Sequence, residues 1–175
     1  TLVMSFESLL PAVSENQLTS GGQGVAYMHM MIGLGALIAT LGLAPISAQS
    51  TLGRLFIISA VLSSLGNHTL AMSRTLVPAL VGTVIIGTSH AAFMTIATII
   101  IQSVSPDYLR GRITSIYLIH AGGLMSFSYF ANGILADFYN PSLILSAGGI
   151  AFLIVVLASW IIPTPRSIYT RGALI

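Results

Sequence analysis

Residues 76–102 read LVPALVGTVIIGTSHAAFMTIATIIIQ and contain no Asp, Glu, Lys or Arg. A helix that crosses the hydrocarbon core of a membrane needs about 20 consecutive, predominantly apolar residues. Similar apolar stretches occupy residues 24–43, 52–72, 113–136 and 142–162, and a shorter one occupies residues 1–12. The sequence therefore predicts an all-α, polytopic membrane helical bundle whose first helix, in residues 1–12, is truncated.

Composition excludes most classes of soluble protein. Hydrophobic residues make up 55% of the chain and charged residues 6%, with a mean hydropathy of +0.95, whereas a soluble domain carries about 25% charged residues. Lipid must therefore cover most of the exterior, so the bilayer is the first expected partner. The positive residues are scattered arginines, which make no nucleic-acid-binding face. Cysteine is absent, which excludes disulfides and thiol nucleophiles.

Short connections between the apolar stretches predict antiparallel neighbours in one compact bundle. Lys and Arg accumulate in short cytoplasmic loops, and here the arginines are unequally divided between the two sides. One side holds Arg54, Arg110, Arg112, Arg166 and Arg171, and the other holds only Arg74. We expect residues 163–175 to form a cytoplasmic tail and the protein to reside in a plasma membrane, as in the inner membrane of a bacterium.

The second half of the 52–72 stretch is polar for a lipid-facing helix. Ser59, Ser63, Ser64, Asn67 and His68 fall within it. Because polar side chains are costly in hydrocarbon, we expect them to face other helices or the membrane interface.

A polar loop at residues 105–112 reads SPDYLRGR. Ser105 can cap a short helix that has proline in its first position and aspartate near its positive end, and Gly111 would end that helix. The loop arginines either anchor an interfacial turn or pair with other parts of a transporter as it changes conformation. The residues of this candidate motif are Pro106, Asp107, Arg110, Gly111 and Arg112.

The region around this loop resembles the major facilitator superfamily of transporters. Residues 102–112 (QSVSPDYLRGR), Ser115-Ile116-Tyr117 and residues 133–137 (GILAD) are similar to the region of its tenth and eleventh helices. Within that superfamily, the sequence most resembles the bacterial enterobactin-exporter and multidrug-efflux branch. The stretch SFSYFAN at residues 126–132 departs from that branch, which usually has a proline and an extra glycine there.

Weaker similarity extends over most of the chain. Gly24 and residues 33–38 resemble the eighth helix of that branch, and Leu9-Leu10-Pro11 resembles the end of the seventh. The resemblance implies the C-terminal six-helix half of a carrier, helices seven to twelve, built as two inverted three-helix repeats. The chain opens with Thr1, and we expect it to be part of a longer polypeptide whose N-terminal half is the missing partner.

Ionisable side chains within apolar helices are functional candidates, because a charge at the bilayer centre costs about 2.5–3.5 kcal/mol or more on insertion scales. Candidates for the substrate or proton pathway are Glu7, His29, His90, His120 and the polar Asn132. Histidine titrates near neutral pH, and burial raises the pKa of carboxyl groups toward that range. The alternative is a packing role, with each histidine neutral and Asn132 hydrogen-bonded between helices.

The face of the 76–102 helix that carries His90 is small and weakly polar. Thr83, Gly87, Met94 and Ala97 share this face at spacings of three and four residues. Such a face suits a cavity or a tight helix contact. No two of the three candidate histidines have the i, i+4 spacing of a metal site, so we expect no metal and no cofactor.

These observations predict a secondary active transporter that exports a small organic molecule or drug by proton-coupled alternating access. The expected partners are the small-molecule substrate and a coupling proton. Two other classes stay open. One is a non-transporting scaffold or assembly subunit of a membrane complex, whose ionisable residues would be dispensable. The other is an intramembrane enzyme, for which no nucleophile–base pair or pair of acids at helical spacing is visible.

Overall fold

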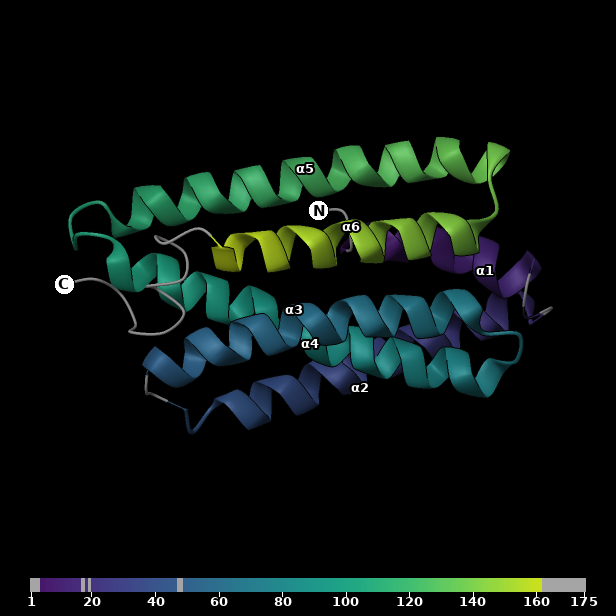
Figure 1. Ribbon diagram of the computed structural model, residues 1–175, viewed down its shortest axis with the longest axis horizontal. Coiled ribbons are helices and arrows are strands. Elements are labelled where there is room, and N and C mark those ends of the chain that lie inside the picture. Colours follow the sequence, from purple (N-terminus) through teal and green to yellow (C-terminus); the bar gives the residue numbers. More distant parts are fainter. Residues whose placement is uncertain (1–3, 17, 19, 47–48, 162–175) are drawn as a thin grey trace.

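The computed structural model describes residues 4–16, 18, 20–46 and 49–161, and within these ranges it is an all-α bundle without strands. A 3-10 helix, η1 (Met4–Leu9), runs into a short helix, α1 (Leu10–Asn16). Five long helices follow, namely α2 (Gly21–Leu43), α3 (Gln49–Met72), α4 (Leu76–Val104), α5 (Arg110–Phe138) and α6 (Pro141–Ile161). The long helices lie side by side along the long axis of the molecule (Figure 1).

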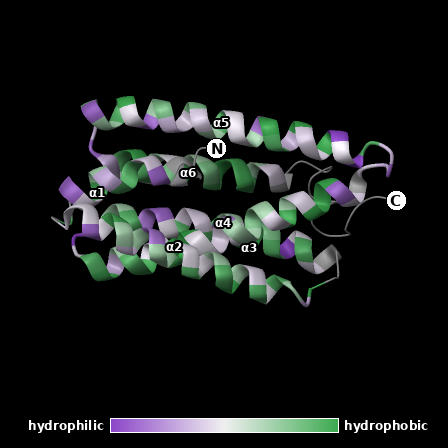
Figure 2. Cartoon of the chain, turned by 180° about the vertical axis from the view of Figure 1, so that it is seen from behind, coloured by the Kyte–Doolittle hydropathy of each residue, from purple (hydrophilic) through white to green (hydrophobic). Residues whose placement is uncertain are grey.

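The five long helices coincide with the five long apolar stretches, to within three residues at each end. Among the described helices, α2, α3, α4 and α6 are long and apolar enough to cross a membrane. Hydrophobic residues extend over most of the length of these helices (Figure 2). α5 has 29 residues, as many as α4, but serines, tyrosines, His120 and Asn132 make it more polar. The expected tail, residues 163–175, lies outside the described residues.

The loop between α4 and α5 differs from the sequence expectation. Ser105 does not cap a separate short helix: its hydroxyl donates to the Ile101 carbonyl at 2.6 Å, at the end of α4. The backbone of Ser105 is extended because it precedes a proline, and this ends α4. A single turn follows, closed by the Leu109 amide on the Pro106 carbonyl at 2.9 Å. Gly111 does not break a helix, since it is the second residue of α5.

The core of the bundle is organised around α4. This helix packs extensively against α2 and α3, and α6 packs on α3. The polar half of α3 faces this core, with Ser59, Ser63, Ser64 and Asn67 buried and His68 exposed. Ser64 donates to the Gly149 carbonyl of α6 at 2.6 Å. Burial against other helices therefore explains why α3 tolerates the three serines and the asparagine.

Glycines set how closely α4 approaches its neighbours. A Cβ atom on Gly87 would collide with the backbone of Ile32 in α2, and one on Gly35 would collide with the Val84 carbonyl in α4. On the other side, a Cβ on Gly82 would lie 3.0 Å from the Leu70 amide nitrogen of α3. Small residues of this kind allow helix backbones to approach each other within membranes.

We predict that Gly87→Ala lowers stability by about 1–3 kcal/mol, because the new methyl group must displace backbone rather than a flexible side chain. Gly33→Ala in α2 is the matched control, since a Cβ atom added at Gly33 would have no neighbour within 4 Å. The control should be neutral or slightly stabilising, because alanine is a better helix former than glycine. Unfolding in mixed micelles, followed by circular dichroism, compares the two. Equal stability of both variants would contradict the close α2–α4 contact.

Candidate functional site

Glu7 is half-buried, whereas the other acidic residues, Glu15, Asp107 and Asp137, are exposed. The helix that carries it, η1, packs against α5. The Glu7 carboxylate Oε2 accepts a hydrogen bond from the Tyr129 hydroxyl of α5, with 3.0 Å between the two oxygens. Both side chains are half-buried. Because hydrogen bonds to a charged acceptor are stronger than neutral ones, this bond ties η1 directly to α5.

His90 lies near the middle of α4 and close to the same point. The buried ring of Phe6 meets the His90 ring edge to face, with centroids 6.3 Å apart and an interplanar angle of 74°. His90 is half-buried and near enough to Glu7 to interact with it electrostatically. η1 therefore brings a carboxylate into contact with a phenol from α5 and near an imidazole from α4.

The face of α4 that carries His90 is used mainly for packing in its first half. Thr83 is fully buried, and Gly87 lies against the backbone of Ile32 in α2. Of the two roles expected for this face, the tight helix contact is therefore the one formed at Gly87. His90 follows three residues later, and its ring meets Phe6 of η1.

His29 and His120 do not join Glu7. α2 turns Met28 toward the core, and the next residue, His29, is rotated by about 100° from it and is exposed. The Nδ1 atom of His29 is 3.0 Å from the carbonyl oxygen of Val25 in the same helix. His120 is exposed on α5. The structure thus brings one of the three candidate histidines to the carboxylate.

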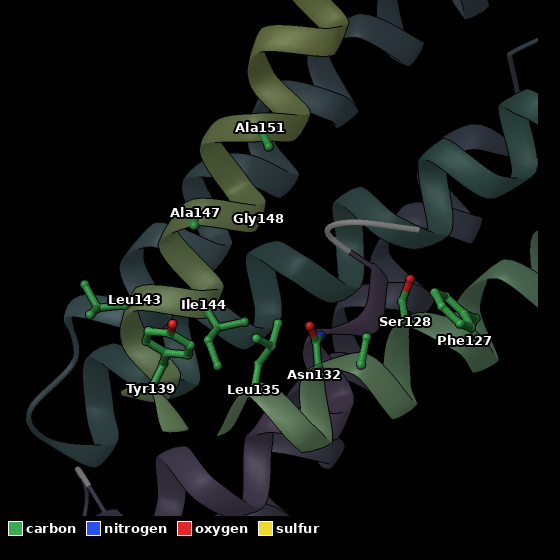
Figure 3. A pocket seen from close by; sticks show the side chains of 11 residues that line it. Phe127, Ser128, Asn132, Leu135, Tyr139, Leu143, Ile144, Ala147, Gly148 and Ala151 are labelled. Atoms are coloured by element: carbon green, nitrogen blue, oxygen red, sulfur yellow. The ribbon is translucent and has the colours of Figure 1, made fainter. Parts of the chain in front are cut away.

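Asn132 lies at a different place on α5, in a pocket between α5 and α6. The pocket has a volume of about 590 Å³. Ser128 and Asn132 project from α5 into it, and Ala147 and Ala151 border it from α6 (Figure 3). Asn132 is half-buried and has an interaction within the protein. It follows Tyr129 by three residues, so the pocket and the Glu7 contact share one stretch of α5.

α5 is held to the rest of the bundle by few contacts. None of its residues is fully buried. Apart from the Tyr129 bond, Tyr117 donates a hydrogen bond to the Met94 sulfur of α4 at 3.6 Å. Hydrogen bonds between helices inside membranes contribute about 0.6 kcal/mol on average. The attachment of α5 therefore rests mainly on its contact with η1, together with a few hydrogen bonds to neighbouring helices.

Arg110, at the start of α5, makes polar contacts with residues that are near it in the sequence. Its Nη2 atom lies 2.8 Å from the Asp107 carboxylate, and its Nε donates to the Gln102 carbonyl at 3.0 Å. The second bond covers a carbonyl at the end of α4 that has no partner within the helix. Arg112 is exposed. The polar contacts of Arg110 are thus with Asp107 in the loop and with the end of α4. Pro106 belongs to the turn, and Gly111 belongs to the first turn of α5.

Sequence reasoning missed two features of the structure. Tyr129 is 122 residues from Glu7, and no local spacing signals such a contact. Phe56, Phe93 and Phe152, from α3, α4 and α6, form an aromatic cluster with centroid separations of 4.3 Å and 5.8 Å. Each phenylalanine is an ordinary apolar residue in its own helix. Among the described residues, no group of three or more His, Cys, Asp or Glu is placed to hold a metal ion.

Comparison with known families gives one match. The sequence model of a family described as transmembrane secretion effectors matches residues 2–169. No curated protein matches the chain, and no solved structure matches it. The match covers nearly all of the chain, including η1 with Glu7 and the whole of α4 and α5.

A double-mutant cycle tests the central contact of the site. We predict that Glu7→Leu and Tyr129→Phe are coupled by about 1–2 kcal/mol in the free energy of unfolding, because each removes one partner of a charged hydrogen bond. The matched control pairs Glu7→Leu with Tyr27→Phe, since Tyr27 is 48% exposed on α2. That pair should be additive. Additivity of the Glu7 and Tyr129 variants would show that the two side chains do not interact in the folded protein.

Proposed function

The chain belongs to the transmembrane secretion effector family, within the major facilitator superfamily of transporters, and we propose that it forms the C-terminal six-helix half of a proton-coupled exporter. The family match points to a transporter rather than an enzyme. In this proposal the substrate is a small organic molecule or drug, as in the enterobactin-exporter and multidrug-efflux branch that the sequence resembles. The N-terminal half would belong to the same polypeptide, with the substrate cavity between the two halves.

One observation carries the proposal of proton coupling. Glu7 is a half-buried carboxylate in a bundle of apolar helices, hydrogen-bonded to Tyr129 and near His90. An ionisable group at such a place is costly to insert into a membrane, and for this reason it usually marks a functional site. Protonation of Glu7 would remove the charge that strengthens its bond to the Tyr129 hydroxyl. The proton would thereby weaken the attachment of α5 to η1.

The weak attachment of α5 supports alternating access. A carrier needs two packings of similar free energy, whose balance shifts when a buried group binds substrate or a proton. α5 has no fully buried residue and meets η1 through the bond that protonation would weaken. We infer that α5 changes its position relative to α4 during transport, while α2 and α4, which are in close contact, move together.

Coupling is tested in the complete native polypeptide, expressed in cells with ethidium as the transported probe. We predict that Glu7→Gln lowers proton-driven efflux about tenfold or more, since a charged hydrogen bond contributes about 1.5–3 kcal/mol and 1.36 kcal/mol is tenfold. Exchange of ethidium without a proton gradient should persist, which separates loss of coupling from loss of folding. His90→Ala should lower efflux as well.

His29→Ala and His120→Ala are the matched controls for the Glu7 contact, because both histidines are exposed and lie apart from Glu7 and Tyr129. Their efflux should stay close to that of the unmodified protein. Full proton-driven efflux by Glu7→Gln would exclude Glu7 as the coupling group. If all four variants pumped ethidium as well as the unmodified protein, a coupling site elsewhere would be the better explanation. Absence of efflux from the unmodified protein itself would favour a non-transporting scaffold.

The arrangement of charges supports an orientation in the membrane. The helix order places Arg54, Arg110 and Arg112 at one end of the bundle. Arg74 lies at the opposite end, together with the acidic residues Glu15 and Asp137. Because positive residues are retained on the cytoplasmic side, we propose that the α4–α5 loop and the C-terminus face the cytoplasm in a plasma membrane.

The orientation has a direct test, since the chain contains no cysteine. Asn16 and Tyr108 are exposed at opposite ends of the bundle. A membrane-impermeant maleimide added to intact cells should label Asn16→Cys and leave Tyr108→Cys unlabelled. Permeabilised cells provide the control, because both variants should then react. Labelling of Tyr108→Cys alone in intact cells would reverse the proposed orientation.

A further inference from the structure

We propose that the pocket between α5 and α6 holds one acyl chain of a membrane phospholipid. The lipid would come from the leaflet at the α5–α6 turn, with its headgroup near that turn. The pocket lies on the side of the bundle formed by α5 and α6. This inference does not depend on the substrate, the coupling ion or the direction of transport proposed above.

The chemistry of the pocket lining favours a hydrocarbon chain. None of the residues that line it is a carboxylate, an amine, a guanidinium or an imidazole. The lining is mostly apolar, and its large side chains include Phe127, Leu135 and Ile144. The polar Asn132 has an interaction within the protein already. A charged or strongly polar ligand would therefore lose its hydration without gaining an ionic partner.

Small residues on α6 make the hollow. Ala147, Gly148 and Ala151 line the α6 side, and large residues on α5 face them. α5 and α6 also make little contact with each other. In a membrane, space of this kind next to apolar helices is filled by lipid, because an empty void forfeits the van der Waals contacts of its lining atoms. The volume of about 590 Å³ is that of a ligand site rather than a packing defect, since ligand pockets occupy about 300–1,000 Å³.

The length and position of the pocket match one leaflet. Its lining on α5 extends from Phe127 to Tyr139, which is about 18 Å at a helical rise of 1.5 Å per residue. Half of the hydrocarbon core of a bilayer is about 15 Å thick. Tyr139 lies next to the α5–α6 turn (Figure 3), and tyrosine is enriched at the level of lipid headgroups. The pocket thus runs from the membrane interface to the region of the midplane.

Lipid binding is tested on the complete native polypeptide, purified in detergent, stripped of lipid and titrated with dioleoylphosphatidylethanolamine. Native mass spectrometry should show one lipid molecule that is retained more strongly than the rest. Ala151→Phe fills the pocket and should weaken that retention about tenfold, which is 1.4 kcal/mol. Ala158→Phe is the matched control, because Ala158 is exposed nearly on the same face of α6, two turns beyond the pocket. The control should retain the lipid.

A second measurement needs no substitution. Phosphatidylethanolamine with a photoreactive diazirine at the end of one acyl chain should label the unmodified protein near Phe127 and Ala151. The same lipid with the diazirine close to the glycerol should label it near Tyr139 and Leu143. Absence of a strongly retained lipid, equal retention by both variants, or labelling without this depth order would overturn the proposal. The first of these outcomes would show that another part of the protein or a second copy covers the pocket.

Discussion

The close approach of α4 to α2 and α3 is the contact on which the rest of the bundle depends. Lipid tails are as apolar as leucine, so apolar helices gain little from simple burial inside a membrane. They associate by van der Waals contact, which requires their backbones to come near each other. Gly35 and Gly87 permit this on the α2 side, and Gly82 permits it on the α3 side. The position of α4, and therefore of His90, follows from these contacts.

α5 has the opposite character. It is as long as α4, yet none of its residues is fully buried. Its contact with η1 and a few hydrogen bonds, from Tyr117, Tyr129 and Arg110, connect it to the bundle. Elements with few buried contacts are those that move at the lowest cost in free energy. The carboxylate of Glu7 stands where this weakly held helix meets the rest of the bundle. The same helix also borders the pocket beside α6, so one element carries both proposals made for this protein.

Prediction from the sequence was good for the helices and poor for the contacts between them. The apolar stretches predicted the long helices correctly, because the length and composition of a segment are local properties of the sequence. The polar residues of α3 were predicted to face other helices or the membrane interface, and Ser59, Ser63, Ser64 and Asn67 do face the protein interior. The prediction of a separate short helix at Ser105 was wrong, because the serine hydroxyl caps the end of α4 instead. Glu7 and His90 were named as candidates, but so were His29 and His120, which the structure leaves exposed.

The sequence by itself determined that this protein is an all-α bundle surrounded by lipid. A chain with so few charged residues cannot form a surface that faces water. In lipid, the polar groups of the backbone must form their hydrogen bonds within helices. Only the tertiary structure decided which polar groups meet. Tyr129 is 122 residues from Glu7, and a helix presents side chains in every direction around its axis. The direction that becomes buried depends on which helix packs beside it, and that choice is made by contacts such as the one at Gly87.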